Sequence, residues 1–182
     1  LYECNLIRDD SFKSLINLKR LTLYKCHSIT ESVFEYLKNI QYLKIRQCEA
    51  IHHLGTGLNC LQELELCDYN LIRDDHFANL ISLEKLTLSN CNSVTGSGFD
   101  YFKNLQCLDI YRCNSLDHFG TGMSNLQELK LYECNLIRDD SFKSLINLKR
   151  LTLDKCRSSF TGSGFDYLQN IEYLNLRGCK SI

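Results

Sequence analysis

The sequence predicts an α/β fold, a solenoid with a curved parallel β-sheet on its concave face and short helices on its convex face. The pattern LxxLxLxxC, with Ile allowed at the apolar positions, recurs in about eight rungs of 21–23 residues. A unit of 65 residues, or three rungs, is duplicated, so residues 1–23 reappear unchanged as residues 131–153. Proline is absent, which leaves the backbone N–H groups free for a hydrogen-bond ladder. The rungs begin at Leu18, Ile40, Leu61, Leu83, Leu105, Leu126, Leu148 and Ile171.

The first half of each rung is expected to be a strand. Its second and third leucines lie two positions apart, so their side chains share one face of the strand. In the first complete rung Leu21 and Leu23 therefore face the core, whereas Arg20, Thr22 and Tyr24 face outward. One rung cannot bury its own apolar face, so the strands must stack in parallel, about 4.8 Å apart, around a shared core.

The second half of most rungs is expected to be a turn and a short helix. A Phe–Leu pair recurs there at helical spacing, and residues 9–11 ahead of Phe12 have the polar side chains of a helix N-cap. The third rung of each unit differs, because residues 53–58 and 118–123 each carry two glycines, which predicts a tighter and less helical segment. The pairs are Phe12/Leu15, Phe34/Leu37, Phe77/Leu80, Phe142/Leu145 and Phe165/Leu168.

Eight of the eleven cysteines occupy the last position of the pattern, where Tyr69 stands in the remaining rung. They form either a metal or redox site or a column of buried thiols. One cysteine per rung does not converge on a point as metal ligands do, and parallel side chains suit disulfides poorly. We therefore predict a structural column whose thiols donate weakly to loop carbonyls. The column is Cys4, Cys26, Cys48, Cys91, Cys113, Cys134, Cys156 and Cys179.

The rung pattern, continued as Cys26-His27-Ser28-Ile29-Thr30-Glu31, resembles the cysteine-containing subclass of leucine-rich repeats. That subclass is common in F-box substrate-recognition subunits of ubiquitin ligases. The resemblance covers essentially the whole chain and implies a leucine-rich-repeat solenoid, but it is weakly specific for function. Rungs such as Cys134-Asn135-Leu136-Ile137 depart from it, and these residues contain no F-box-like helical segment. Residues 105–125 are also similar to the repeats of intracellular immune receptors, without the proline those repeats often carry.

Composition and motifs argue against several classes of function. A net charge of −1 disfavours nucleic acid and membrane surfaces as partners, and no apolar stretch is long enough to span a bilayer. The chain has no GxSxG, HExxH or phosphate-loop motif, and the adjacent pair His52-His53 lacks further ligands at metal spacing. We therefore expect neither an enzyme nor a site for a metal or cofactor.

The outward strand positions are the candidate binding surface, since the sheet of such a solenoid lines its concave side. Tyrosines recur there, and they offer a large contact area at low entropic cost. Charges of both signs surround them, which favours a protein partner over phosphate backbones. Taken singly, each residue is also explained as a solvated member of a cross-strand pair. The candidates are Tyr24, Tyr42, Lys44, Arg46, Glu63, Glu65, Asp109, Tyr111, Lys130, Tyr132, Arg150, Asp154, Tyr173 and Arg177.

Two functional hypotheses follow. The first is a protein–protein interaction module, for substrate recognition in a ubiquitin ligase or for ligand sensing. The alternative is a structural or self-associating array, a spacer without a specific ligand. Residues 1–182 are expected to form a single array belonging to a longer protein, because neither end shows a polar capping rung and uncapped ends favour end-to-end association. Cys67 and Cys107 fall at outward strand positions, where free thiols suit an intracellular location, cytoplasmic or nuclear.

Overall fold

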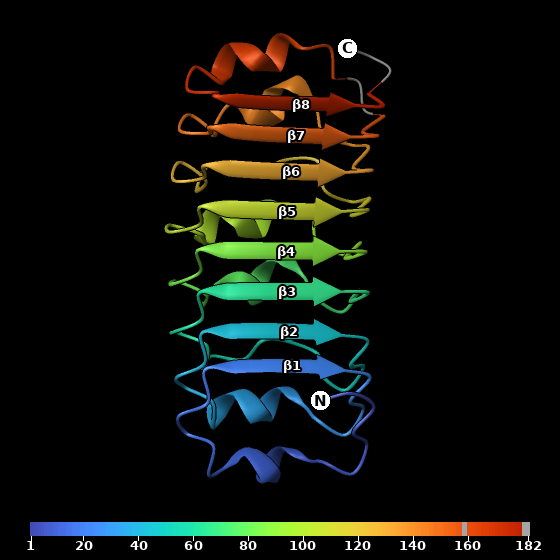
Figure 1. Ribbon diagram of the computed structural model, residues 1–182, viewed down its shortest axis with the longest axis vertical. Coiled ribbons are helices and arrows are strands. Elements are labelled where there is room, and N and C mark those ends of the chain that lie inside the picture. The colour runs from blue at the N-terminus through green and yellow to red at the C-terminus, as the bar shows by residue number, and fades with distance from the viewer. Residues whose placement is uncertain (158–159, 180–182) are drawn as a thin grey trace.

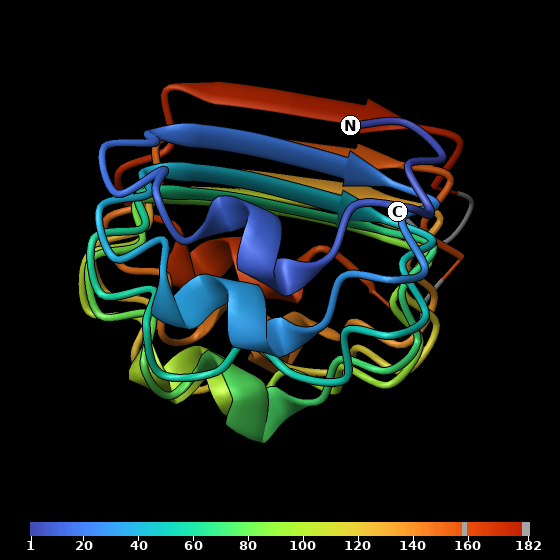
Figure 2. The same ribbon diagram turned by 90° about the horizontal axis from the view of Figure 1, so that it is seen from below.

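The computed structural model describes residues 1–157 and 160–179. Eight parallel strands of five residues each form one sheet, paired in chain order (Figure 1). Seen along the stack, the central strands lie closer to the helical side than the end strands do, so the open face of the sheet is concave (Figure 2). The strands are β1 (Arg20–Tyr24), β2 (Tyr42–Arg46), β3 (Glu63–Cys67), β4 (Lys85–Ser89), β5 (Cys107–Tyr111), β6 (Glu128–Tyr132), β7 (Arg150–Asp154) and β8 (Tyr173–Arg177).

The convex side carries single-turn 3-10 helices, which are shorter and tighter than the predicted helices. Their hydrogen bonds run from residue i+3 to residue i, as from the Val33 N–H to the Thr30 carbonyl at 3.3 Å. A rung of 21–23 residues that already contains a strand and two turns has no room for more. These helices are η1 (Asp9–Phe12), η2 (Glu31–Glu35), η3 (Asp74–Phe77), η4 (Ser97–Tyr101), η5 (Asp139–Phe142) and η6 (Ser163–Tyr167).

The two glycine-containing rungs were predicted to be less helical, and in the described residues they have no helix. Between β2 and β3, and again between β5 and β6, the described chain crosses the convex side without a helical turn. Gly57 shows why the segment must be tight, because a Cβ atom on it would lie 2.2 Å from the Phe34 carbonyl oxygen of the preceding rung. The rungs approach so closely there that only a hydrogen atom fits.

The acidic residues predicted to cap the first helix have another role. Arg8 is the N-cap of η1, and it makes no side-chain capping bond. The Asp9 carboxylate instead accepts hydrogen bonds from the N–H (2.9 Å) and the hydroxyl (2.6 Å) of Thr30, one rung later. Asp74 and Asp139 repeat this contact at η3 and η5. The aspartates therefore tie neighbouring rungs together, because stacking brings the next rung's N–H groups closer than those of their own helix.

The core is one continuous cluster along the stack, and it confirms the predicted strand register. Leu23 is fully buried, and the phenylalanines of the predicted pairs are buried or partly buried in the cluster. Leu15 is the exception, with 43% of its surface exposed, because it lies in the first rung that the structure describes. Leu174 and Leu176 are also exposed, because β8 is the last strand of the described sheet.

The cysteine column is buried and its thiols are free, which confirms the structural interpretation. Only its first and last members, Cys4 and Cys179, are half-buried. The predicted loop acceptors were wrong for most of the column, because from Cys48 to Cys179 the thiols contact the carbonyls of strand residues. The Cys91 Sγ lies 3.6 Å from the Leu66 carbonyl of the previous strand and 3.5 Å from the Ser89 carbonyl of its own. Burial raises the pKa of other column thiols, to about 12 at Cys134, so they stay protonated and inert.

Candidate functional site

The concave face consists of the first, third and fifth side chains of every strand. In β1 to β7 these residues are half-buried or exposed, whereas the second and fourth are buried. In-register pairing sets equivalent positions side by side, so each outward position forms a row across the sheet. All fourteen candidate residues lie in these three rows. The structure thus brings them onto one face, and their role in binding stays a prediction.

The part of this face from β1 to β3 is organised around Glu65. Its carboxylate accepts hydrogen bonds from the Lys44 ammonium at 2.7 Å and the Tyr42 hydroxyl at 2.9 Å. Burial opposes ionisation of Glu65, but these two hydrogen bonds outweigh it and lower the pKa of the carboxyl. The Arg20 guanidinium lies 3.9 Å from the centre of the Tyr42 ring. Each of these side chains therefore has a partner that restricts its rotamers.

A second network crosses β5 to β7. The Lys130 ammonium lies 2.9 Å from Glu128 Oε1 and 3.5 Å from Asp109 Oδ1, and Arg150 Nε lies 3.6 Å from the same Glu128 oxygen. The Asp109 contact has an ion-pair distance without hydrogen-bond geometry, so this oxygen is buried with no hydrogen bond. Burial raises the pKa of the Asp109 carboxyl in spite of the nearby Lys130 and Lys85. Asp109 faces outward as predicted, yet it is not freely solvated.

A rim of polar side chains follows the ends of the strands, and none of its members, among them Asn90 and Arg112, is one of the fourteen candidates. The residue before each column position has a left-handed backbone, with φ of 53° at both of these residues. Arg112 Nε lies 2.8 Å from Glu133 Oε2, and Lys155 Nζ lies 3.6 Å from Glu133 Oε1. Strand alternation cannot place these side chains because it ends one residue earlier. The available signal was their fixed position, directly before the column, in every rung.

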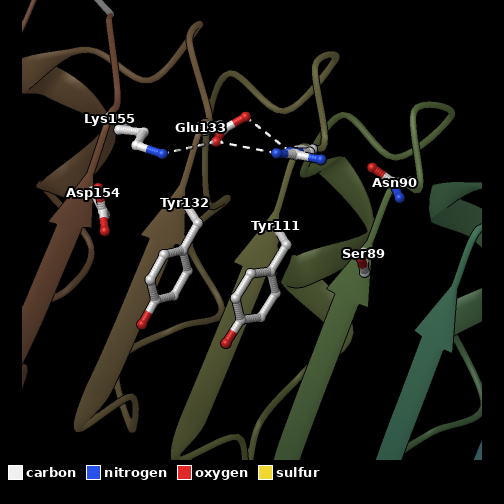
Figure 3. Close-up of a pocket in the computed structure, with 8 residues that line it drawn as sticks. Ser89, Asn90, Tyr111, Tyr132, Glu133, Asp154 and Lys155 are labelled. Atoms are coloured by element: carbon white, nitrogen blue, oxygen red, sulfur yellow. Dashed lines mark hydrogen bonds and ion pairs between the residues drawn. The ribbon is translucent and has the colours of Figure 1, made fainter. Parts of the chain in front are cut away.

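Tyr111 and Tyr132, the last residues of β5 and β6, lie beside this rim on the concave face (Figure 3). Their rings are stacked, with centres 4.4 Å apart and planes 4° from parallel. Together with Ser89, Asp154 and rim residues they line a pocket of about 290 Å³. Glu63 and Arg177, also predicted, form no ion pair within the described part of the chain.

A different set of groups meets on the convex side. Ser97 Oγ lies 3.4 Å from His118 Nε2, and His118 Nδ1 contacts Asp117 Oδ1. This order matches the nucleophile, base and orienting acid of a hydrolytic triad. The setting does not, because the Asp117 and His118 side chains are 56% and 44% exposed and the shallow pocket that they line does not include Ser97. Ser97 also shares its hydroxyl with Thr95 at 3.2 Å. These contacts are those of a solvated turn.

Within residues 1–157 and 160–179, no three His, Cys, Asp or Glu side chains are arranged to bind a metal ion. No helix among these residues has both the length and the apolar surface to cross a bilayer.

Comparison with known families identifies the repeat. The sequence matches the family described as BspA type leucine-rich repeat region, in six copies over residues 2–58 and 58–172. The chain belongs to this family. The predicted leucine-rich-repeat fold of this BspA-type array is thereby confirmed. No curated protein matches the sequence.

Solved structures show the same architecture. A chain of the octameric complex of Latrophilin 3, Unc5D and FLRT2 is 24% identical, with a TM-score of 0.68 over 92% of this array and 56% of that chain. A chain of the TLR13–ssRNA13 complex is 19% identical, with a TM-score of 0.62 over 93% and 30%. A chain of the yeast Rad7–Elc1 complex is 18% identical, with a TM-score of 0.58 over 95% and 60%. The array spans less than two thirds of each of these chains, and at such identities the likeness shows the fold alone.

Proposed function

We propose that this BspA-type array is a non-catalytic binding module that recognises another protein through its concave face. The observation that carries the proposal is the pre-ordered state of that face, where Tyr42, Lys44 and Glu65 already restrain one another. A surface ordered in this way loses little side-chain entropy when a partner binds. Its charges alternate in sign, a pattern that a folded protein can complement and a uniform phosphate backbone cannot.

Complexes of similar folds are consistent with this choice. FLRT2 was solved together with Latrophilin 3 and Unc5D, and Rad7 together with Elc1. The TLR13 structure holds single-stranded RNA, so nucleic acid is the competitor that an experiment must test. The net charge of −1 favours the protein, because binding driven by phosphate contacts needs a basic surface.

Narrower roles belong to the same proposal. Substrate recognition in a ubiquitin ligase is supported by the resemblance of the rung pattern to F-box proteins, and ligand sensing by the resemblance to immune-receptor repeats. An intracellular site of action is supported by the free thiols, including the half-buried Cys67 and Cys107 on the concave face. The alternative, a structural or self-associating spacer, predicts no partner other than the chain itself.

Affinity capture from native cells with mass spectrometry tests the proposal. The wild type is compared with a concave variant in which Tyr42, Tyr111, Tyr132 and Tyr173 are replaced by Ala. The matched control is Tyr101→Ala/Tyr167→Ala, which removes tyrosines that are 45% and 39% exposed on η4 and η6. We expect a partner that survives nuclease treatment, remains with the control and is lost from the folded concave variant.

Three results would contradict the proposal. Identical partners for the wild type and the concave variant would leave the concave face without a binding role. Capture of copies of this chain alone would favour the self-associating spacer. Loss of the partner on nuclease treatment would make nucleic acid the ligand.

A further inference from the structure

Three of the five concave tyrosines have an arginine of this chain over the ring. A guanidinium in that position is attracted by the negative face of the ring. Tyr111 and Tyr132 differ, because they stack on each other and no lysine or arginine in the described residues lies over either ring. The guanidinium-to-ring-centre distances are 3.9 Å for Arg20 over Tyr42, 4.8 Å for Arg150 over Tyr173 and 5.3 Å for Arg46 over Tyr24.

In two of these pairs an acidic side chain completes the contact. Arg46 lies over Tyr24 and places its Nε 3.1 Å from Asp68 Oδ2. Arg150 lies over Tyr173 and places its Nε 3.6 Å from Glu128 Oε1. The sheet therefore twice holds a guanidinium between a tyrosine ring and a carboxylate.

Tyr132 also has a carboxylate nearby but no arginine, and here the ring and the carboxylate belong to adjacent rungs, whereas in the two pairs above they lie two rungs apart. Asp154 is its register partner on β7, on the side of Tyr132 away from Tyr111 (Figure 3). Both residues line the pocket of about 290 Å³, so open space adjoins them. Asp154 Oδ1 is buried and has no hydrogen-bond partner, which is costly for a charged group. Arg177 follows in the same row, yet no ion pair joins it to Asp154.

We propose that Tyr132 and Asp154 form a receptor for one arginine side chain of a partner protein, a proposal that rests on the binding function above. The guanidinium stacks on the free face of the Tyr132 ring and donates to the Asp154 carboxylate. The terminal torsion of an aspartate is soft, so rotation about it brings Oδ1 to the ligand. The planar fork of arginine serves ring and carboxylate together, whereas the point charge of lysine does so less well.

The surrounding charges allow a cation to enter. Arg112 and Lys155 line the same pocket, but both lie within ion-pair distance of the Glu133 carboxylate, at 2.8 and 3.6 Å. Glu133 therefore neutralises much of their repulsion. Asp154 is then the acid of this pocket that lacks a basic partner.

The test is an NMR titration in which the peptide acetyl-Gly-Arg-Gly-amide is added to the protein, whose tyrosine rings are isotopically labelled. We expect saturable shifts at the Tyr132 and Tyr111 rings, and a loss of affinity of at least tenfold in Asp154→Asn and in Tyr132→Leu. The peptide with citrulline, which keeps the shape and removes the charge, should bind at least tenfold more weakly. Glu63→Gln is the matched control, because it removes another concave acid without an ion pair. Arg177→Ala should bind as well as the wild type or more tightly.

The receptor is refuted if the citrulline or lysine peptide binds as well as the arginine peptide, or if Asp154→Asn behaves like Glu63→Gln. The titration needs no partner, so its failure is separate from that of the proposed function. If the peptide causes no shifts but the concave tyrosine variant still loses a partner, the arginine receptor is refuted and the proposed binding function stands. Peptide binding at Tyr132, together with a partner that Asp154→Asn retains, would refute the assignment of the site to that partner's arginine.

Discussion

Removal of the Asp74 carboxylate should uncouple two rungs in the middle of the stack. Asp74 opens η3 and accepts four hydrogen bonds from the next rung. The donors are the Thr95 hydroxyl at 2.8 Å and the backbone N–H groups of Thr95, Gly96 and Gly98, each at 3.1 Å. Asp74→Ala deletes all four bonds and leaves three backbone donors without a protein acceptor.

The size of the effect follows from these bonds. A hydrogen bond contributes about 0.5–1.5 kcal/mol net, so four bonds are worth about 2–6 kcal/mol. Asp74 is half-buried, and water can reach some of the vacated donors, which places the expected loss at about 2–4 kcal/mol. Asp74→Asn should lose less than Asp74→Ala, because its remaining carbonyl oxygen can still accept from Gly96 and Gly98.

The effect should also depend on pH. Burial opposes ionisation of Asp74, but the hydrogen bonds from Gly98 and Thr95 outweigh it and lower the pKa of the carboxyl below 3.8. A carboxyl whose pKa is lower in the folded state than in the unfolded state stabilises the protein at any pH above its unfolded-state pKa. That stabilisation is lost as the pH falls through the folded-state pKa. The stability advantage of the wild type over Asp74→Asn should therefore be full at neutral pH and shrink below pH 3.8.

Urea denaturation followed by circular dichroism, at neutral pH and below pH 3.8, measures both effects. The control is Asp75→Ala, at the next position, whose side chain is 77% exposed and should change the free energy of unfolding by less than about 0.5 kcal/mol. Equal losses for Asp74→Ala and Asp75→Ala would refute the assignment of the rung contact to Asp74. A pH-independent difference between the wild type and Asp74→Asn would refute the role of its charge.

Three further predictions concern stability and are measured by thermal and urea unfolding. Gly57→Ala should cost about 3 kcal/mol because its Cβ would lie 2.2 Å from a backbone oxygen. Gly55→Ala, with φ of +60° and its nearest contact at an ordinary 3.9 Å, should cost about 1 kcal/mol, and equal costs would contradict the close approach of the rungs at Gly57. Tyr69→Phe should stabilise the protein by up to about 1 kcal/mol because it removes a buried hydroxyl without a hydrogen-bond partner, and a clear loss would indicate a missed partner. Leu108→Asp should unfold several rungs because it buries a charge, whereas the neighbouring Asp109→Asn should leave the stability at pH 7 unchanged or raised. Burial raises the pKa of the Asp109 carboxyl, so its charge weakens the folded state at that pH. Similar losses of stability from both variants would contradict the strand register.

The strands, their register and the cysteine column could all be predicted from the sequence. Leu or Ile recurs at the positions of Leu21 and Leu23 in every rung. Because each rung must bury these two side chains on the same face, only one strand register is possible. The two glycines of residues 53–58 also predicted the tight crossing, because a position such as Gly57, crowded by the backbone of a neighbouring rung, admits only glycine.

The convex helices and the caps were harder to predict. A Phe–Leu spacing does not distinguish a 3-10 turn from an α-helix, and the length left in the rung decides between them. Asp9 has the chemistry of an N-cap, but its acceptor atoms lie nearer to Thr30 of the next rung. Contacts between residues about 21 positions apart depend on how the rungs stack, which a local pattern does not contain.

By itself the sequence determined that this protein is a leucine-rich-repeat solenoid with tyrosines and mixed charges on one face, because periodicity dictates which side chains share a face. Only the tertiary structure decided which of those side chains already contact an oppositely charged or aromatic partner in their own chain. Tyr42 lies under an arginine of its own chain, whereas Tyr132 lies beside an acid without one. That difference arises from rotamers and cross-strand pairing in the folded sheet, so it exists only once the rungs have stacked.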